Sequence, residues 1–256
     1  MAKVIDLNCD MGESYGRWTL GADEAIMPFI SSANVACGYH GGDPHVMRKT
    51  VELALRHGVA IGAHPGLPDL MGFGRRALDV SPAELRDYFC YQTGALRGFC
   101  RAAGTDLQHV KPHGILYAMA EKEEAIAQAI GEAAREAGER MILFTLANTR
   151  YDRHCRKMGL RVAGEGFADR AYNVDGTLVS RKLPGSLITD PARAAEQAVM
   201  IAHGRVRTLD GVEIEVDVQT ICCHGDTPGA ERIVRAVREG LEAAGIQVRP
   251  LRDWLP

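Results

Sequence analysis

The sequence lacks the features that mark several large classes of protein. No stretch of its 256 residues concentrates lysine or arginine, and 30 basic against 33 acidic side chains give a formal net charge of −3. A nucleic acid or an anionic membrane surface therefore has no electrostatic support as a partner. The longest apolar run, Met141 to Ala147, is interrupted by Thr145. It is far shorter than the roughly 20 residues that a membrane-spanning helix needs.

Signals for secretion are also missing. The seven cysteines are odd in number, form no C-x-x-C pair and lie mostly in apolar segments, which is typical of free thiols in a reducing compartment. Residues 1–10 carry acidic side chains in a strand-like pattern, where a signal peptide would have a basic segment followed by an apolar one. We therefore expect a cytoplasmic protein. No P-loop motif is present, so any ATP is not bound through one in this chain.

What the sequence does contain is an alternation of short β-type segments with longer segments of helical periodicity, the pattern of parallel βα units. The expected strands are residues 4–9, 33–37, 59–63, 107–110, 141–145, 161–164 and 219–223, with a short eighth at 247–249. The expected helices are residues 44–57, 81–103, 121–137, 191–203 and 227–244. Ser81-Pro82-Ala83-Glu84 predicts a capping box at one helix start, and a glycine follows each helix end.

Seven or eight βα units in a chain of this length favour a closed β/α barrel, while periodicity alone leaves an open doubly wound sheet possible. Residues 206–216, centred on Asp210-Gly211, predict a hairpin. Because no linker or repeat divides the chain, we expect a single barrel domain over residues 1–256 with a small hairpin insertion near 205–217. In either fold, ligands bind at the carboxyl ends of the strands.

The first two strand exits carry unusual polar residues. Asp6, Asn8, Asp10 and Glu13 alternate along the first strand and its exit. Acids avoid strand interiors and need partners when buried, so we expect a functional role for at least Asp10. The second exit is a glycine-rich turn, residues 37–44, that contains His40 and Asp43 and opens a helix. This is a natural anion site, although Asp43 is equally suited to capping the helix.

The later strand exits continue the pattern. They contribute His64, Lys111, His113, Glu165, Asp169, Arg170, His224 and Asp226. Together these side chains predict a polar pocket. Two chemistries fit it. One is a His/Asp metal site that activates water. The other is a metal-free acid/base pocket in which Lys111 and Arg170 hold an anionic substrate or a phosphate. The spacing does not choose between them.

Six segments, read in order, resemble the LamB/YcsF family from about residue 3 to residue 250. The segments are residues 6–13, 32–44, 58–65, 109–117, 167–172 and 224–226. The resemblance implies a seven-stranded parallel β/α barrel of the glycoside hydrolase/deacetylase type. It also implies that the chain is the A subunit of an ATP-dependent 5-oxoprolinase. With subunits B and C, such an enzyme opens the lactam of 5-oxo-L-proline to L-glutamate at the expense of ATP, which is expected to carry Mg²⁺.

On this resemblance we expect site residues with two kinds of role. The expected catalytic residues are Asp10, His64, Lys111, His113 and Glu165. The expected substrate- or phosphate-binding residues are Glu13, His40, Asp43, Asp169, Arg170, His224 and Asp226. The related deacetylases bind a metal through an H-x-x-x-H motif, but His45 comes five residues after His40 here, so the presence of a transition metal stays open. Two alternatives remain: a metal-dependent amide hydrolase that acts alone, and a non-catalytic substrate-binding subunit.

Overall fold

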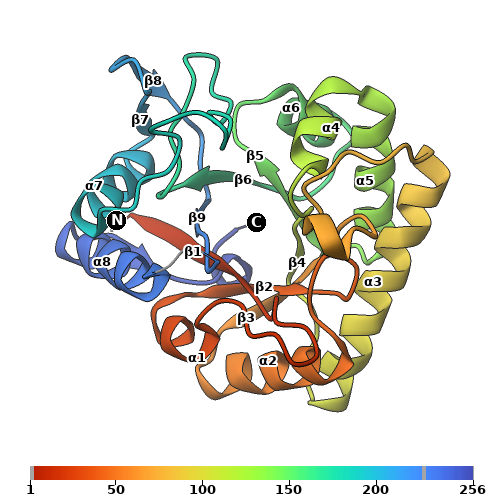
Figure 1. Ribbon diagram of the computed structural model, residues 1–256. Coiled ribbons are helices and arrows are strands. Elements are labelled where there is room, and N and C mark those ends of the chain that lie inside the picture. The colour runs from red at the N-terminus through yellow and green to blue at the C-terminus, as the bar shows by residue number, and fades with distance from the viewer. Residues whose placement is uncertain (1–2, 227–228, 256) are drawn as a thin grey trace.

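Seven parallel strands close into a barrel. The computed structural model describes residues 3–226 and 229–255. The barrel strands are β1 (Val4–Met11), β2 (Ser32–Ala36), β3 (Ala60–His64), β4 (His109–Val110), β5 (Ile142–Leu146), β6 (Val162–Phe167) and β9 (Thr220–Cys223). Each pairs with the next, and β9 pairs with both β6 and β1. This closure, visible at the centre of Figure 1, confirms the expected barrel and excludes the open sheet.

Helices surround the barrel (Figure 1). They are α1 (Asp23–Ile26), α2 (Pro44–Arg56), α3 (Pro82–Ala102), α4 (Leu116–Lys122), α5 (Glu124–Glu136), α6 (Arg150–Lys157), α7 (Pro191–Ala202) and α8 (Ala230–Ala243). Three 3-10 helices are η1 (Met27–Phe29), η2 (Leu70–Gly72) and η3 (Leu251–Asp253). The predicted capping box of α3 is present, with the side chains of Ser81 and Glu84 each accepting from the other's backbone N–H.

The helix predictions differ from the structure at three places. The helix expected at 121–137 corresponds to α5, which begins after Glu123, while α4 ends at Lys122 and lies almost wholly before that range. The short helices α1 and α6 were not expected, because α1 has only four residues and α6 has eight that are mostly charged. The start of the helix expected at 227–244 lies outside the described residues, and α8 begins at Ala230.

The two faces of the barrel strands differ in chemistry. On β1, Leu7, Cys9 and other apolar side chains join the main hydrophobic core. The alternate residues Asp6, Asn8 and Asp10 point to the opposite face, into the barrel. A small apolar cluster of Ile142, Phe144, Ala163 and Leu251 lies apart from that core. The Phe144 ring stacks on the interior His109 ring, so this cluster lies below the polar residues. The acids and histidines of the interior thus lie on the side of the carboxyl ends of the strands.

Close packing inside the barrel imposes a glycine. The ring of His109 on β4 lies against Gly62 on β3, so that a Cβ at residue 62 would approach the ring to 2.1 Å. His109 Nε2 in turn is 2.7 Å from Asn34 Oδ1 on β2. An alanine at position 62 would displace this imidazole and its contact with Asn34.

The remaining strands lie outside the barrel. β7 (Arg205–Arg207) and β8 (Glu213–Glu215) form an antiparallel hairpin. β10 (Gln247–Val248) pairs in parallel with the start of β1, at Val4 and Ile5. All seven cysteines fall within the described ranges and are free, and six of them are buried. Among the described residues, no helix is long and apolar enough to span a membrane.

Candidate active site

A lysine between two carboxylates occupies the upper end of the barrel interior. Lys111, directly after β4, has its Nζ 2.8 Å from Asp10 Oδ1 on β1 and 3.0 Å from Glu165 Oε1 on β6. All three side chains are buried. Burial opposes the charge of Lys111, but Asp10 and Glu165 outweigh it and hold the pKa of the ammonium well above its usual value. Lys111 therefore stays protonated.

Asp10 is held as a carboxylate. Burial by itself raises the pKa of an acid, but the neighbouring His64 and Lys111 bring the pKa of Asp10 well below its usual value. Asn34 also donates to Asp10 Oδ1, over 2.9 Å. Asp10 is thus an ionised acceptor beside a permanent cation, as a group that orients or deprotonates water must be.

Beside Asp10 lies a group of four buried residues, Glu13, His40, His64 and His113, here called the histidine cluster. One side-chain nitrogen or oxygen from each lies within 4.8 Å of the others. His40 Nε2 is 3.5 Å from Glu13 Oε1, and His113 Nδ1 is 3.9 Å from the same oxygen. The rings of His40 and His113 stack with centroids 3.5 Å apart, and His64 meets both rings edge-on.

Burial controls the charges in the histidine cluster. It lowers the pKa values of His40 and His113 well below the usual value, and the neighbouring histidines lower them further. Burial also raises the pKa of Glu13 well above its usual value, as does the charge of Asp10. These imidazoles are therefore neutral, with lone pairs free to accept.

Several polar atoms of the histidine cluster have no hydrogen-bond partner among the described residues. They are Glu13 Oε1 and both ring nitrogens of His40. Leaving a buried polar group unsatisfied costs about 1–3 kcal/mol. Unsatisfied atoms that converge on one point are typical of a binding site for a ligand, because a purely structural cluster would pair them internally.

The tautomers of His64 and His113 follow from their outer hydrogen bonds. His64 Nδ1 lies 2.8 Å from the backbone oxygen of Lys111, and His113 Nε2 lies 2.8 Å from that of Phe73. A carbonyl oxygen only accepts, so both of these nitrogens carry the proton and donate. The inner nitrogens, His64 Nε2 and His113 Nδ1, face each other at 3.0 Å, and His64 Nε2 also lies 3.5 Å from Asp10 Oδ2.

A second polar group lines the same mouth. The backbone N–H of His224 donates to Asp169 Oδ2 over 2.9 Å, and its Nδ1 lies 2.9 Å from the same oxygen. Burial raises the pKa of Asp169, but His224 outweighs this and the pKa is below its usual value. Asp226 forms an ion pair with Arg75 Nη2 at 2.6 Å, joining the loops after β9 and β3 across the opening.

Two predicted site residues serve the scaffold. Asp43 is the N-cap of α2 and accepts from His45 N and Val46 N. Of its two expected roles, the structure therefore shows the helix cap. Arg170 donates to the backbone oxygens of Val179 and Ser186, and burial lowers its pKa to about 10. Its guanidinium thus holds the loop after β6, and it does not join the lysine and its two carboxylates.

Other residues of the site were not predicted. Asn34 donates to both Asn8 and Asp10, Tyr117 donates to Glu165 over 2.7 Å, and Cys222 Sγ is 3.1 Å from Lys111 Nζ. For Asn8 and Asn34 a signal existed, because they keep the period-two alternation of the interior acids on β1 and β2. Neither Tyr117 nor Cys222 has such a pattern.

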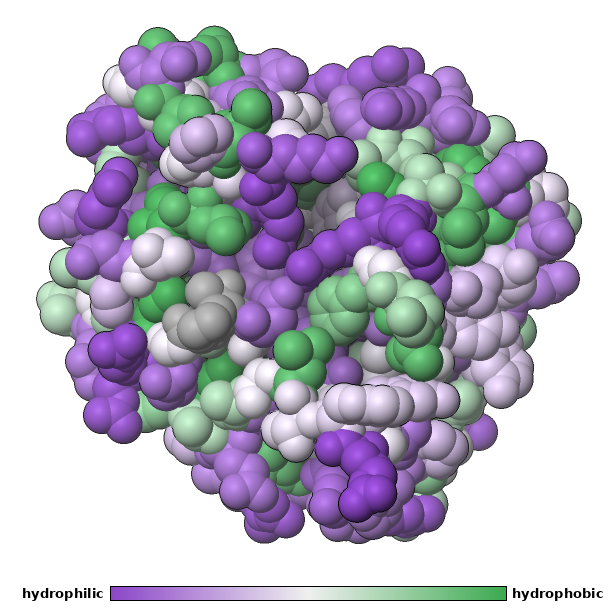
Figure 2. Space-filling model, in the orientation of Figure 1, coloured by the Kyte–Doolittle hydropathy of each residue, from purple (hydrophilic) through white to green (hydrophobic). Residues whose placement is uncertain are grey.

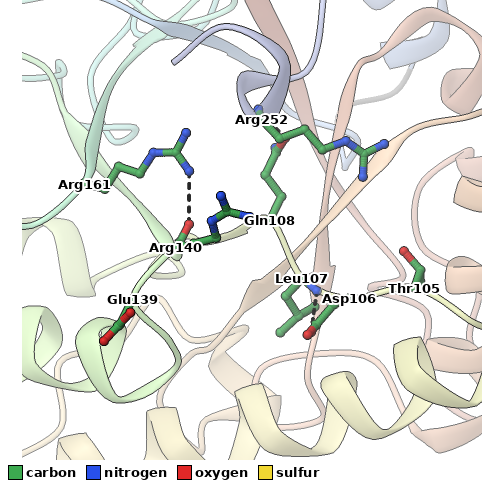
Figure 3. Close-up of a pocket in the computed structure, with 8 residues that line it drawn as sticks. All are labelled: Thr105, Asp106, Leu107, Gln108, Glu139, Arg140, Arg161 and Arg252. Carbon is green, nitrogen blue, oxygen red and sulfur yellow. Dashed lines mark hydrogen bonds between the residues drawn. The ribbon is translucent and has the colours of Figure 1, made fainter. Parts of the chain in front are cut away.

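The face that carries these loops is hollowed near its centre and rimmed by hydrophilic side chains (Figure 2). A separate cavity of about 560 Å³ lies at the other end of the barrel, near the amino ends of β4 to β6 (Figure 3). It is lined by Thr105, Asp106, Leu107, Gln108, Glu139, Arg140, Arg161 and Arg252. It contains no predicted site residue, and it lies opposite the end at which barrels of this kind bind substrate.

Comparison with known proteins assigns the family. Residues 5–256 match the LamB/YcsF family, and the chain belongs to it. It is 52% identical over 252 residues to the A subunit of 5-oxoprolinase from Pyrococcus furiosus, covering 98% of this chain and 99% of that protein. It is 50% identical to the A subunit of 5-oxoprolinase from Bordetella pertussis, covering 97% and 99%.

A solved structure agrees with this assignment. The lactam utilization protein from Thermus thermophilus superposes with a TM-score of 0.91 at 49% identity, covering 96% of this chain and 99% of that one. The LamB/YcsF resemblance seen in the sequence motifs is therefore confirmed over the whole chain.

Proposed function

We propose that this chain is the hydrolytic subunit of a 5-oxoprolinase, in which it opens the lactam of 5-oxo-L-proline to give L-glutamate. The observation that carries the proposal is the Asp10–Lys111–Glu165 group beside the histidine cluster. It places a fixed cation, an ionised acceptor and neutral imidazoles in one buried site. The names of the relatives that match nearly the whole chain support the choice of substrate.

Opening a lactam requires three catalytic roles. The carbonyl oxygen must be stabilised as charge develops on it, the attacking water must lose a proton, and the ring nitrogen must gain one. Lys111 is the donor for an oxyanion or for the substrate carboxylate. Asp10 accepts the proton of the water as its oxygen bonds to the lactam carbon. Asp10 then returns this proton to the ring nitrogen as the C–N bond breaks, which yields glutamate.

We assign the use of ATP to the complex with subunits B and C. An amide is a poor electrophile, and transfer of the γ-phosphoryl group to the lactam oxygen, with release of ADP, makes its carbon open to attack by water. After water adds, the C–N bond breaks as the ring nitrogen takes a proton, and a second water hydrolyses the resulting γ-glutamyl phosphate to glutamate and phosphate. The fixed positive charge of Lys111 suits the phosphorylated intermediate, and Mg²⁺ accompanies the nucleotide.

Glutamate release from 5-oxoproline tests this proposal. The purified chain is assayed alone and then with subunits B and C, each with and without ATP. We expect glutamate to form only in the complete mixture with ATP. Absence of glutamate from every mixture overturns the proposed substrate. Glutamate from the lone chain without ATP favours the alternative of a self-sufficient amide hydrolase.

Variants separate a catalytic role from a role in binding alone. Asp10→Asn keeps the shape of the side chain and removes its charge, so the complex should lose most of its turnover. His57→Ala, at an exposed histidine far from the site, is the matched control. Normal turnover by the Asp10→Asn complex would assign the chemistry to the partners and leave this chain a binding role.

A further inference from the structure

We propose that Glu13, His40, His64 and His113 together bind one divalent transition-metal ion. The inference goes beyond the proposed function and does not depend on the identity of the substrate. The four residues come from four different strand exits, and one ligand atom of each lies within 4.8 Å of the others. A site that draws on four separate segments is positioned by the closed barrel and not by a local sequence motif.

The contact between His64 and His113 calls for a cation. Their outer nitrogens donate to the backbone oxygens of Lys111 and Phe73, which leaves the inner nitrogens, His64 Nε2 and His113 Nδ1, facing each other at 3.0 Å. Two lone pairs at this distance repel each other unless a positive centre lies between them or beside them. Either a proton or a metal ion can supply it.

Glu13 and His40 decide in favour of a metal. Glu13 Oε1 and both nitrogens of His40 are buried without a hydrogen-bond partner in the described structure, so a single proton between His64 and His113 leaves them unsatisfied. A metal ion satisfies Glu13, one nitrogen of His40 and the two facing lone pairs at once. The outer carbonyl partners of His64 and His113 are also the contacts that orient imidazole ligands in metal sites.

The spacing and the atom types fit the same ion. Bonds of about 2.0–2.1 Å in a tetrahedral site place ligand atoms roughly 3.3 Å apart. Three of the six separations lie around that value, at 3.0 Å for His64 to His113, 3.5 Å for Glu13 to His40 and 3.9 Å for Glu13 to His113, and all six are within 4.8 Å. Three imidazoles and one carboxylate suit Zn²⁺, Co²⁺ or Ni²⁺ and not Mg²⁺, which prefers oxygen ligands.

The loop after β3 closes the site on its outer side. Gly74 packs against the cluster, and a Cβ there would lie 2.6 Å from His113 Cδ2 and 2.8 Å from His40 Cβ. The Phe73 ring meets His40 and His113 edge-on. This cover shields the ligands from water, as the second coordination shell of a metal site does.

The first test is direct titration of the full-length chain. The chain is stripped with dipicolinate, freed of chelator, and titrated with Zn²⁺ and separately with Co²⁺. The expected result is one equivalent bound per chain after gel filtration, a raised midpoint of thermal unfolding and visible d–d absorption of the Co²⁺ form. In proton spectra of that form, three exchangeable hyperfine-shifted imidazole N–H signals are expected. Absence of stoichiometric binding overturns the proposal.

Variants then locate the ion. Glu13→Gln and His40→Gln should each weaken Zn²⁺ binding more than about 100-fold. His57→Ala, at an exposed histidine, should leave the affinity unchanged. His224→Gln tests the second group that could hold a metal, Asp10, Cys222 and His224, and should also retain the ion. Loss of Zn²⁺ in His224→Gln with retention in Glu13→Gln contradicts the assignment.

Because binding is measured without substrate, its outcome is independent of glutamate release. Circular dichroism of the stripped proteins verifies that each variant is folded. The signal count in the Co²⁺-loaded wild-type chain tests the histidine ligands even if a variant does not fold. Fewer than three such signals contradicts ligation by His40, His64 and His113 together.

Discussion

Lys111 and Asp10 form the central contact of the candidate active site, with Nζ 2.8 Å from Oδ1 between two buried side chains. Glu165 approaches the same ammonium to 3.0 Å. The lysine therefore pairs with two buried acids at once. The stability of the barrel interior and the charge of the site consequently depend on the same side chain.

Replacing Lys111 with methionine should destabilise the protein strongly. Removing one partner leaves two buried carboxylates uncompensated, a loss of about 3–5 kcal/mol in the free energy of unfolding. Urea denaturation at neutral pH measures it. The double variant Lys111→Met with Glu165→Gln should lose less than the sum of the single changes, because one orphaned charge is removed with its partner. Additive losses would show that the two residues do not interact.

The carboxylate of Asp10 is expected to act in the chemical step. Asp10→Asn should lower turnover by the assembled complex by about 10²–10⁴-fold, the usual contribution of a general base. Asp190, whose side chain caps α7, is a matched acid far from the site. Asp190→Ala should cost about 1 kcal/mol of stability through loss of the cap and leave turnover intact. Equal turnover losses in both variants would contradict the assignment.

Asp6 should make stability depend on pH. Burial raises its pKa to about 6, against hydrogen bonds from Thr220, Ser31 and Ser32 that lower it. The folded chain therefore holds this proton more tightly than the unfolded chain. Its stabilising contribution is complete below about pH 4 and is lost as pH rises through about 6, a change of about 3 kcal/mol.

The comparison with Asp6→Asn isolates this effect, because Asp23 also has a pKa raised to about 6 by burial. The free energy of unfolding of both proteins is measured from about pH 4 to about pH 7.5. The variant should gain relative to the wild-type chain as pH rises. A difference that is constant over this range would show that Asp6 does not titrate there.

Two glycines should respond to alanine in opposite ways. Gly74 has φ +60°, and a Cβ there would meet the rings of the histidine cluster, so Gly74→Ala should cost about 1–3 kcal/mol. Gly98 lies inside α3, where a Cβ would meet nothing within 4 Å. Gly98→Ala should therefore stabilise the protein by about 0.5–1 kcal/mol. Thermal unfolding of the two variants measures both changes. A Gly74→Ala variant as stable as the wild-type chain would contradict the close packing of residue 74 against the histidine cluster.

The fold was largely predictable because it depends on local patterns. Near-continuous apolar segments marked several of the seven strands, and Ser81 and Glu84 marked the start of α3. The short helix α6 was not predictable, because its charged sequence reaches the core only through Tyr151 and Cys155. Closure of the barrel depends on pairing between β1 and β9, which no local pattern encodes.

The sequence predicted which residues lie at the strand exits and so form the site. It did not predict which side chains contact one another there. That His64 and Lys111 lie close together follows from the rule that strand ends share one edge of a barrel. That Arg170 faces the carbonyls of its own loop, while Arg75 reaches Asp226, depends on how the loops fold back. Side-chain direction in irregular segments has no period in the sequence, so such partners need coordinates.

The pairing of β1 has a consequence for how the chain is made. β1 is complete early in synthesis, but its neighbours β9 and β10 are translated last, and Thr220 donates to Asp6 across 214 positions. Until then the backbone of β1 is unpaired on one side and its interior acids have only part of their hydrogen bonds. The nascent chain therefore exposes an incomplete sheet edge on the ribosome, where chaperone contacts are most needed, and the barrel closes only after translation has reached its final strands.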